Sequence, residues 1–135
     1  MFYKTKASSI SGTDFREVHK KAMAIYREIT CHTKRRPYIR AAYFNESNFF
    51  LGLFWQHIWD QHKWQDRMRR LKYFDVAIEL IRHSRFEPDS KKNPNAKHEI
   101  LHRFGGITVN QEVFFVQIKE NEITGQKHFI SVFPK

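Results

Sequence analysis

The chain is poor in the residues that build disulfides, phosphate-binding loops and membrane spans. Among its 135 residues there is one cysteine, Cys31, so no disulfide can form within the chain. The five glycines include neither a GxGxxG nor a GxxxxGK(S/T) pattern, which leaves ATP or NAD chemistry without support. No apolar run approaches the roughly 18 residues of a membrane-spanning helix. The first residues also lack the apolar run of a secretory signal, so we expect a cytoplasmic protein with no membrane partner.

Patterns that bind metal ions are missing as well. His57 and His62 are five residues apart, a poor match to one helix face, and His98 and His102 fall in an expected strand. The sequence contains no HExxH, no CxxC and no cluster of carboxylates. We therefore expect neither a metal ion nor a cofactor.

What the chain does have is apolar mass and positive charge. Hydrophobic residues make up 41% of it, with 13 phenylalanines, which is enough for one folded domain. Lysine and arginine total 24 against 14 acidic residues, a formal net charge of +10. This excess points to a polyanionic partner, most simply nucleic acid. Two alternatives stay open: a surface kept basic for solubility, which usually requires less charge, and a basic patch for an acidic protein.

Helical patterns occupy the first two thirds of the chain. Asp14, with a glutamate three residues later, is a capping-box signature, and the apolar spacing after it predicts a helix over residues 14–30. A second helix is predicted over residues 49–61, with Ser47 as its N-cap. A third, with a basic first half and an apolar stripe, is predicted over residues 64–83.

Three other segments have the composition of loops. The first twelve residues are polar and are predicted as a lead-in to the first helix. Residues 33–47 are basic and contain Pro37, which predicts a loop with a short extended piece at residues 38–44. Residues 86–97 hold two prolines and three lysines, which predicts a long loop and hence a candidate for function.

The last third of the chain predicts a three-stranded antiparallel meander. Strands are expected over residues 98–104, 112–120 and 127–133, with Gly125 at the left-handed position of the second turn. Helices followed by such a meander indicate an α+β fold. We expect a single domain over residues 1–135.

The second hairpin has a predicted register in which Lys119 lies opposite Lys127. This register collects the aliphatic side chains on one face, against the helices, whereas a slip of one residue would mix the faces. The other face would carry a cation, an amide and a hydroxyl among aromatic rings: Phe115, Gln117, Lys119, Lys127, Phe129 and Ser131. A bulge at Gly105–Gly106 would decide whether His102 or Arg103 joins them.

Metal-free cleavage of RNA fits this inventory of side chains. The reaction needs a base for the ribose 2′-OH, an acid for the 5′ oxygen and cations around the phosphorane, while the RNA supplies its own nucleophile. Five side chains have suitable chemistry: His57, His102, Arg103, Lys119 and Ser131. Others would contact the RNA: Arg67, Arg69, Arg70, Lys72, Gln117 and Lys127. Taken singly, each has a structural explanation, such as a histidine in the core or a solvated basic helix face, but the combination favours function.

These pieces together resemble the barnase–EndoU–colicin–RelE superfamily of metal-independent ribonucleases, in particular its branch from phages and mobile elements. The matching segments are FWQHIWDQH, IRHSRFEPDSK, ILHRF, VFFVQIK and HFISVF, so the resemblance covers about residues 50–133. It implies a barnase/RelE-like fold, with N-terminal helices packed on the C-terminal meander sheet, and a ribonuclease-like core at residues 48–135. Residues 1–47 would be an N-terminal helical extension. The cleft would be lined by His57, Arg103, Lys119 and Ser131.

Three functions are carried forward, in order of support. The first is a small basic endoribonuclease that leaves a 2′,3′-cyclic phosphate. It would be a toxin of a toxin–antitoxin or mobile-element system, whose acidic antitoxin protein would cover the cleft. The second is a nucleic-acid-binding module that does not cut. The third is a basic protein-interaction or inhibitor module.

Overall fold

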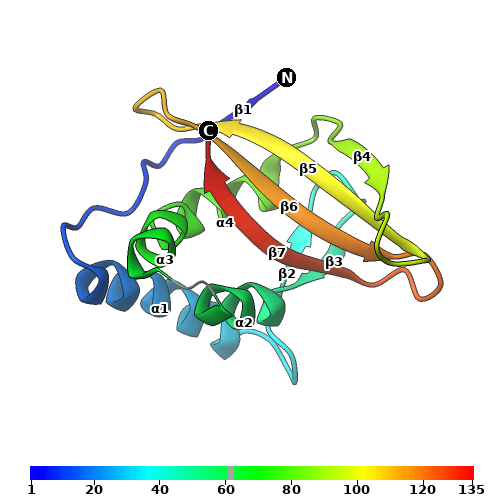
Figure 1. Cartoon of the computed structure of the whole chain (residues 1–135), viewed down its shortest axis with the longest axis horizontal. Coiled ribbons are helices and arrows are strands. Elements are labelled where there is room, and N and C mark those ends of the chain that lie inside the picture. The colour runs from blue at the N-terminus through cyan, green and yellow to red at the C-terminus, as the bar shows by residue number, and fades with distance from the viewer. Residues whose placement is uncertain (61–62) are drawn as a thin grey trace.

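The computed structural model describes residues 1–60 and 63–135, in which a curled seven-stranded sheet is combined with helices (Figure 1). The strand order is β1-β5-β6-β7-β3-β2, and β4 pairs with β5 beside this path. The strands are β1 (Tyr3–Lys4), β2 (Tyr38–Ala41), β3 (Ser47–Phe50), β4 (Asp89–Lys92), β5 (Glu99–Ile107), β6 (Val113–Asn121) and β7 (Lys127–Pro134). The helices are α1 (Phe15–Cys31), α2 (Gly52–Asp60), α3 (Trp64–Leu71) and α4 (Phe74–His83). The expected α+β class is confirmed at this level.

Strands β5, β6 and β7 are the predicted meander, each antiparallel to the next. Side-chain alternation explains them, because Phe114, Val116 and Ile118 are fully buried while the residues between them are not. Gly125 has φ +74° in the second turn, as predicted. The sequence left a bulge at Gly105–Gly106 open, and the β5–β6 ladder runs through both glycines without a shift.

The predicted register of the second hairpin is also wrong, because a bulge in its middle shifts the pairing. Lys119 lies opposite His128, not Lys127. Phe129 consequently faces the core, where it is fully buried and stacks on Phe54 with ring centroids 4.6 Å apart. The extra residue puts the side chains on its two sides out of phase: Ser131, after it, lies on the predicted open face, whereas Phe129 and Lys127, before it, lie on the inner face.

Two short strands share the outer edge of β5, and neither follows from the sequence pattern. β1 pairs in parallel with the end of β5, with Tyr3 opposite Gly106. β4 pairs antiparallel with its beginning, with Asp89 opposite Arg103, inside the segment expected to be a long loop. All four residues of β4 are exposed, so it has no apolar alternation and depends on β5 for its hydrogen bonds.

The second predicted helix begins later than expected, because β3 occupies its first residues. Phe49 pairs with β2 on one side and β7 on the other, and it is fully buried. The helix α2 starts at Gly52, so Ser47 is not its N-cap. The predicted last residue, Gln61, and the neighbouring His62 lie outside the described residues.

The third predicted helix is two helices, α3 and α4, which meet at Lys72 and Tyr73. The Lys72 carbonyl accepts a hydrogen bond from the Ile10 N–H at 2.7 Å, and the Tyr73 hydroxyl donates to Glu112 at 2.9 Å. Burial and the bond to Glu112 raise the pKa of Tyr73 to about 12. The break allows α3 to lie against β7 while α4 lies against β2.

Helix α1 begins at its predicted cap, since the Asp14 carboxylate accepts from the Glu17 N–H at 2.8 Å. Its buried side, Val18, Ala22 and Ile29, enters the same hydrophobic core as the sheet. The first 47 residues therefore contribute strands and core side chains to the same unit as the meander. In the ranges 1–60 and 63–135, no helix is both long and apolar enough to cross a membrane.

A carboxylate on α4 fixes the N-terminal segment beside the sheet. Glu79 accepts hydrogen bonds from the Tyr3 hydroxyl at 3.0 Å and from the N–H groups of Lys6 and Ala7 at 2.8 and 3.1 Å. Burial, together with this contact, raises the pKa of Tyr3 to about 12. The predicted lead-in is thus attached to the fold at several points.

Candidate functional site

The meander has one face toward the core and one face away from it, which we call the open face. The open face includes Leu101, Arg103, Gly105, Phe115, Gln117, Lys119, His128, Ser131 and Phe133. The register places Arg103, Gln117 and Ser131 in one row across the three strands. Arg103 is exposed and the other two are half-buried. The choice left open by the sequence is therefore resolved in favour of Arg103.

Arg70 of α3 reaches the end of this row and donates a hydrogen bond from Nη1 to the Ser131 hydroxyl. The guanidinium is half-buried, and among the described residues it has no carboxylate within ion-pair distance and no partner for its buried Nε. Burial, and then the neighbouring Arg69, lower the pKa of Arg70 against an opposing effect of Asp66. A half-buried cation whose charge is not balanced is suited to binding an anion.

Helix α2 supplies an imidazole and a carboxylate to the same place. His57 and Asp60, one helical turn apart, line a depression of about 450 Å³ together with Arg70, Gln117 and Ser131. His57 is exposed, which excludes its interpretation as a core residue. Sequence reasoning missed Asp60, whose only signal is its three-residue spacing from His57 on a helix.

Arg103 lies over two rings of the open face. Its Cζ is 5.8 Å from the ring centroid of Phe115 and 5.5 Å from that of Phe133. A second depression, of about 290 Å³, is lined by Arg103 and Gln117, and Gln117 also lines the first. The two depressions are therefore neighbouring parts of one surface that crosses the sheet.

Lys119 lies in the next row of the open face, opposite His128. Its Nζ is 3.4 Å from a carboxylate oxygen of Glu99, so its charge is partly balanced. Burial, and then the charges of Lys119 and Arg36, lower the pKa of His128. Lys119 and His128 occupy the row next to Gln117 and Ser131, and they are not among the described residues that line the depression containing His57.

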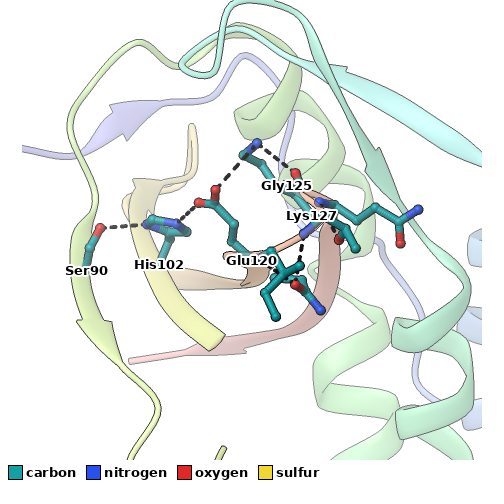
Figure 2. A network of polar contacts seen from close by, with 9 residues as sticks. Ser90, His102, Glu120, Gly125 and Lys127 are labelled. Carbon is teal, nitrogen blue, oxygen red and sulfur yellow. Dashed lines mark hydrogen bonds and ion pairs between the residues drawn. The ribbon is translucent and has the colours of Figure 1, made fainter. Parts of the chain in front are cut away.

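His102 lies on the opposite, inner face with Phe104, Phe114, Val116, Ile118, Phe129 and Val132. Its Nδ1 is hydrogen-bonded to the Ser90 hydroxyl at 2.6 Å and its Nε2 to Glu120 at 2.8 Å. Figure 2 shows this chain continuing to Lys127, whose Nζ is 3.9 Å from Glu120 and donates to the Gly125 carbonyl. The structure thus places His102 and Lys127 together on the inner face, although His102 also borders the smaller depression that Arg103 and Gln117 line.

The basic residues of α3, and Lys72 just after it, differ in the parts of the molecule that they contact. Arg67 donates to the Trp59 carbonyl and lies over the Trp59 ring, with Cζ 5.4 Å from its centroid. Arg69 has a carboxylate one turn earlier at 3.7 Å, and Lys72 follows the last turn. Among the described residues of this run, Arg70 is the one that lines the depression.

The described part of the chain contains no group of three or more side chains arranged to hold a metal ion. No protein-family model, curated protein or solved structure matches this chain, so the family resemblance stays a prediction.

Proposed function

We propose that this protein binds RNA on its open face and cleaves it without a metal ion. The observation that carries the proposal is the convergence of His57, Arg70 and Ser131 on one depression. A phosphodiester is anionic and its cleavage requires proton transfer, so an exposed imidazole beside an unbalanced cation suits it. The net charge of +10 favours association with a polyanion.

The proposed reaction is attack of a ribose 2′ oxygen on the adjacent phosphorus. The 2′-OH proton passes to a base as the new O–P bond forms, and the bond to the 5′ oxygen breaks as an acid protonates that oxygen. The products are a 2′,3′-cyclic phosphate and a 5′-hydroxyl. His57 would carry out one proton transfer and Asp60, which lines the same depression, the other. Arg70 and Ser131 would bind the phosphate oxygens.

The arrangement of the open face also supports the proposed kinship with barnase/RelE-like ribonucleases. A helical His57, Arg103 on the first strand of the meander and Ser131 on the last all border it. An acidic antitoxin would fit the same basic face. If the protein is a toxin, its expression alone should arrest growth, and His57→Ala should relieve the arrest.

The direct test is incubation of the purified protein with RNA in excess EDTA. Wild-type protein should cleave, and His57→Ala should cleave about 10²–10⁴-fold more slowly because one proton transfer loses its catalyst. His83→Ala is the matched control, since His83 is an exposed histidine at the end of α4. Equal rates for wild type and His57→Ala would remove His57 from the mechanism.

A second candidate is RNA binding without cleavage. It is favoured by the extension of a cation and a ring, Arg103 and Phe115, beyond the depression that contains His57. It predicts affinity that falls steeply as salt rises, with no change in RNA length over long incubation. Binding to one acidic protein, but not to bulk RNA, would instead favour a protein-interaction module.

A further inference from the structure

We infer that Phe2, Phe115 and Phe133 form a stacking platform for nucleobases, which restricts the protein to single-stranded RNA. Phe115 and Phe133 are opposite each other on β6 and β7, with ring centroids 5.8 Å apart. The Phe2 ring lies 6.1 Å from Phe115 on its other side. The three rings therefore form a row across the open face, next to the row of Arg103, Gln117 and Ser131. This inference rests on the proposed function.

The place of Phe2 is built into the sheet. Its ring lies on Gly105, where a Cβ would come within 2.5 Å of a ring carbon. The following residue, Tyr3, pairs with β5 and donates its hydroxyl to Glu79. Phe2 nevertheless remains 44% exposed, so a large apolar ring is held at a defined position with a free surface.

Guanidinium groups border the platform on the side of the two depressions, Arg70 at the one that contains His57 and Arg103 at the smaller one. Arg103 lies over Phe115 and Phe133, and the Cζ of Arg70 is 5.8 Å from the Phe133 centroid. Aromatic rings beside a cationic track are the arrangement by which proteins hold single strands, with bases on the rings and phosphates on the cations. Phe133 also lines the depression that contains His57. A base on Phe133 would therefore lie beside the phosphate at Arg70.

A duplex cannot use this platform, because its bases are stacked on each other and do not present their faces. The charge of the open face alone would attract single-stranded and duplex RNA alike. The rings are thus the feature that distinguishes the two forms.

The test compares binding of a 12-nucleotide oligoadenylate and of the same strand in a duplex with oligouridylate, by fluorescence anisotropy at fixed salt. Phe115→Leu and Phe133→Leu keep apolar bulk and remove the ring faces. Each should weaken oligoadenylate binding about tenfold, within the range of about 1–3 kcal/mol per stacked base, and leave duplex binding unchanged. Phe86→Leu, at a partly exposed phenylalanine outside the platform, is the matched control.

Gly105→Ala is a second test that retains every ring. Its new Cβ would displace Phe2, so it should weaken oligoadenylate binding to the same extent as Phe2→Ala. Urea unfolding of each variant identifies any loss of folding. Unchanged oligoadenylate binding in all four variants would overturn the platform while leaving the proposed function standing. If wild-type protein neither bound nor cleaved RNA of either form, the proposed function itself would fail.

Discussion

His102 and Arg103 are neighbours on β5, yet their side chains lie on opposite faces of the sheet. On the inner face, His102 is 7% exposed and both ring nitrogens have partners, Ser90 and Glu120. On the open face Arg103 is exposed, and Arg70, at the other end of its row, has no carboxylate partner among the described residues. A buried polar group with all its partners stabilises a fold, whereas an unbalanced cation is available to a ligand. Whether a polar residue of β5 stabilises the fold or is available to a ligand therefore depends on the face of the sheet on which its side chain lies, and not on its residue type.

The largest expected effect on stability comes from removing one phenylalanine ring from the inner face, compared with removing one from the open face. Phe129→Ala should lower the free energy of unfolding by about 3–5 kcal/mol, because Phe129 is fully buried and stacked on Phe54. Phe133→Ala on the open face should cost only about 1 kcal/mol, because that ring is partly exposed. Urea unfolding followed by circular dichroism measures both. Equal losses would contradict the bulged register.

The adjacent glycines of β5 give a second comparison between the faces. A Cβ on Gly106 would come within 2.4 Å of the Phe114 ring and 2.8 Å of Leu80, both in the core. Gly106→Ala should therefore cost about 1–3 kcal/mol of stability through overpacking. Gly105→Ala meets only the Phe2 ring, which is 44% exposed and would be displaced toward solvent, so it should cost less. The order of the two urea midpoints is the measurement, and a reversed order would contradict this assignment of faces.

A smaller effect is expected where the inner face is polar. Glu120→Gln keeps the size of the side chain but removes the charge that faces His102 and Lys127. We expect a loss of about 1 kcal/mol in unfolding free energy, at the low end for a buried hydrogen bond. The rate of RNA cleavage should not change, since this network lies away from the open face. A folded variant with reduced cleavage would instead place His102 in the reaction.

Much of the fold was accessible from local sequence patterns. The meander strands and α1 were predicted because alternation, turn glycines and a cap are local signals, as Gly125 and Asp14 illustrate. The register was not, because Phe129 and Ile130 are both apolar and either could face the core. Strand β4 was missed because its four residues are all exposed and show no apolar alternation. It is a strand only through its pairing with β5.

The candidate site divides in the same way. The sequence indicated His57, Arg103 and Ser131, because their side chains suit phosphate chemistry and each lies on a helix or strand that could be predicted by itself. The structure brings all three to one surface. It could not single out Arg70 from the neighbouring cations, since the rotation of a short helix against β7 decides which one faces the sheet. That rotation accompanies the break after α3, where the Lys72 carbonyl accepts a hydrogen bond from the N–H of the distant Ile10.

The smallest expected effect concerns His128, where the open face meets β3. Burial, and then the positive charges of Lys119 and Arg36, lower its pKa in the folded protein below the ordinary value of 6.5. The unfolded chain therefore binds this proton more readily than the folded protein does. The resulting contribution to stability is present above about pH 6.5 and is lost as the pH falls through the folded pKa.

Urea midpoints measured between pH 7 and pH 5 should consequently fall less in His128→Gln than in wild type. Added salt should reduce the difference, because two of the three causes are charge repulsion and these charges are partly exposed. A wild-type protein that loses no more stability than His128→Gln would mean that the repulsion on the open face does not reach His128. The excess of positive charge on the open face would then be confined to the surroundings of Arg70. A salt-sensitive difference between the two proteins would instead show that this excess also reaches His128, beside β3.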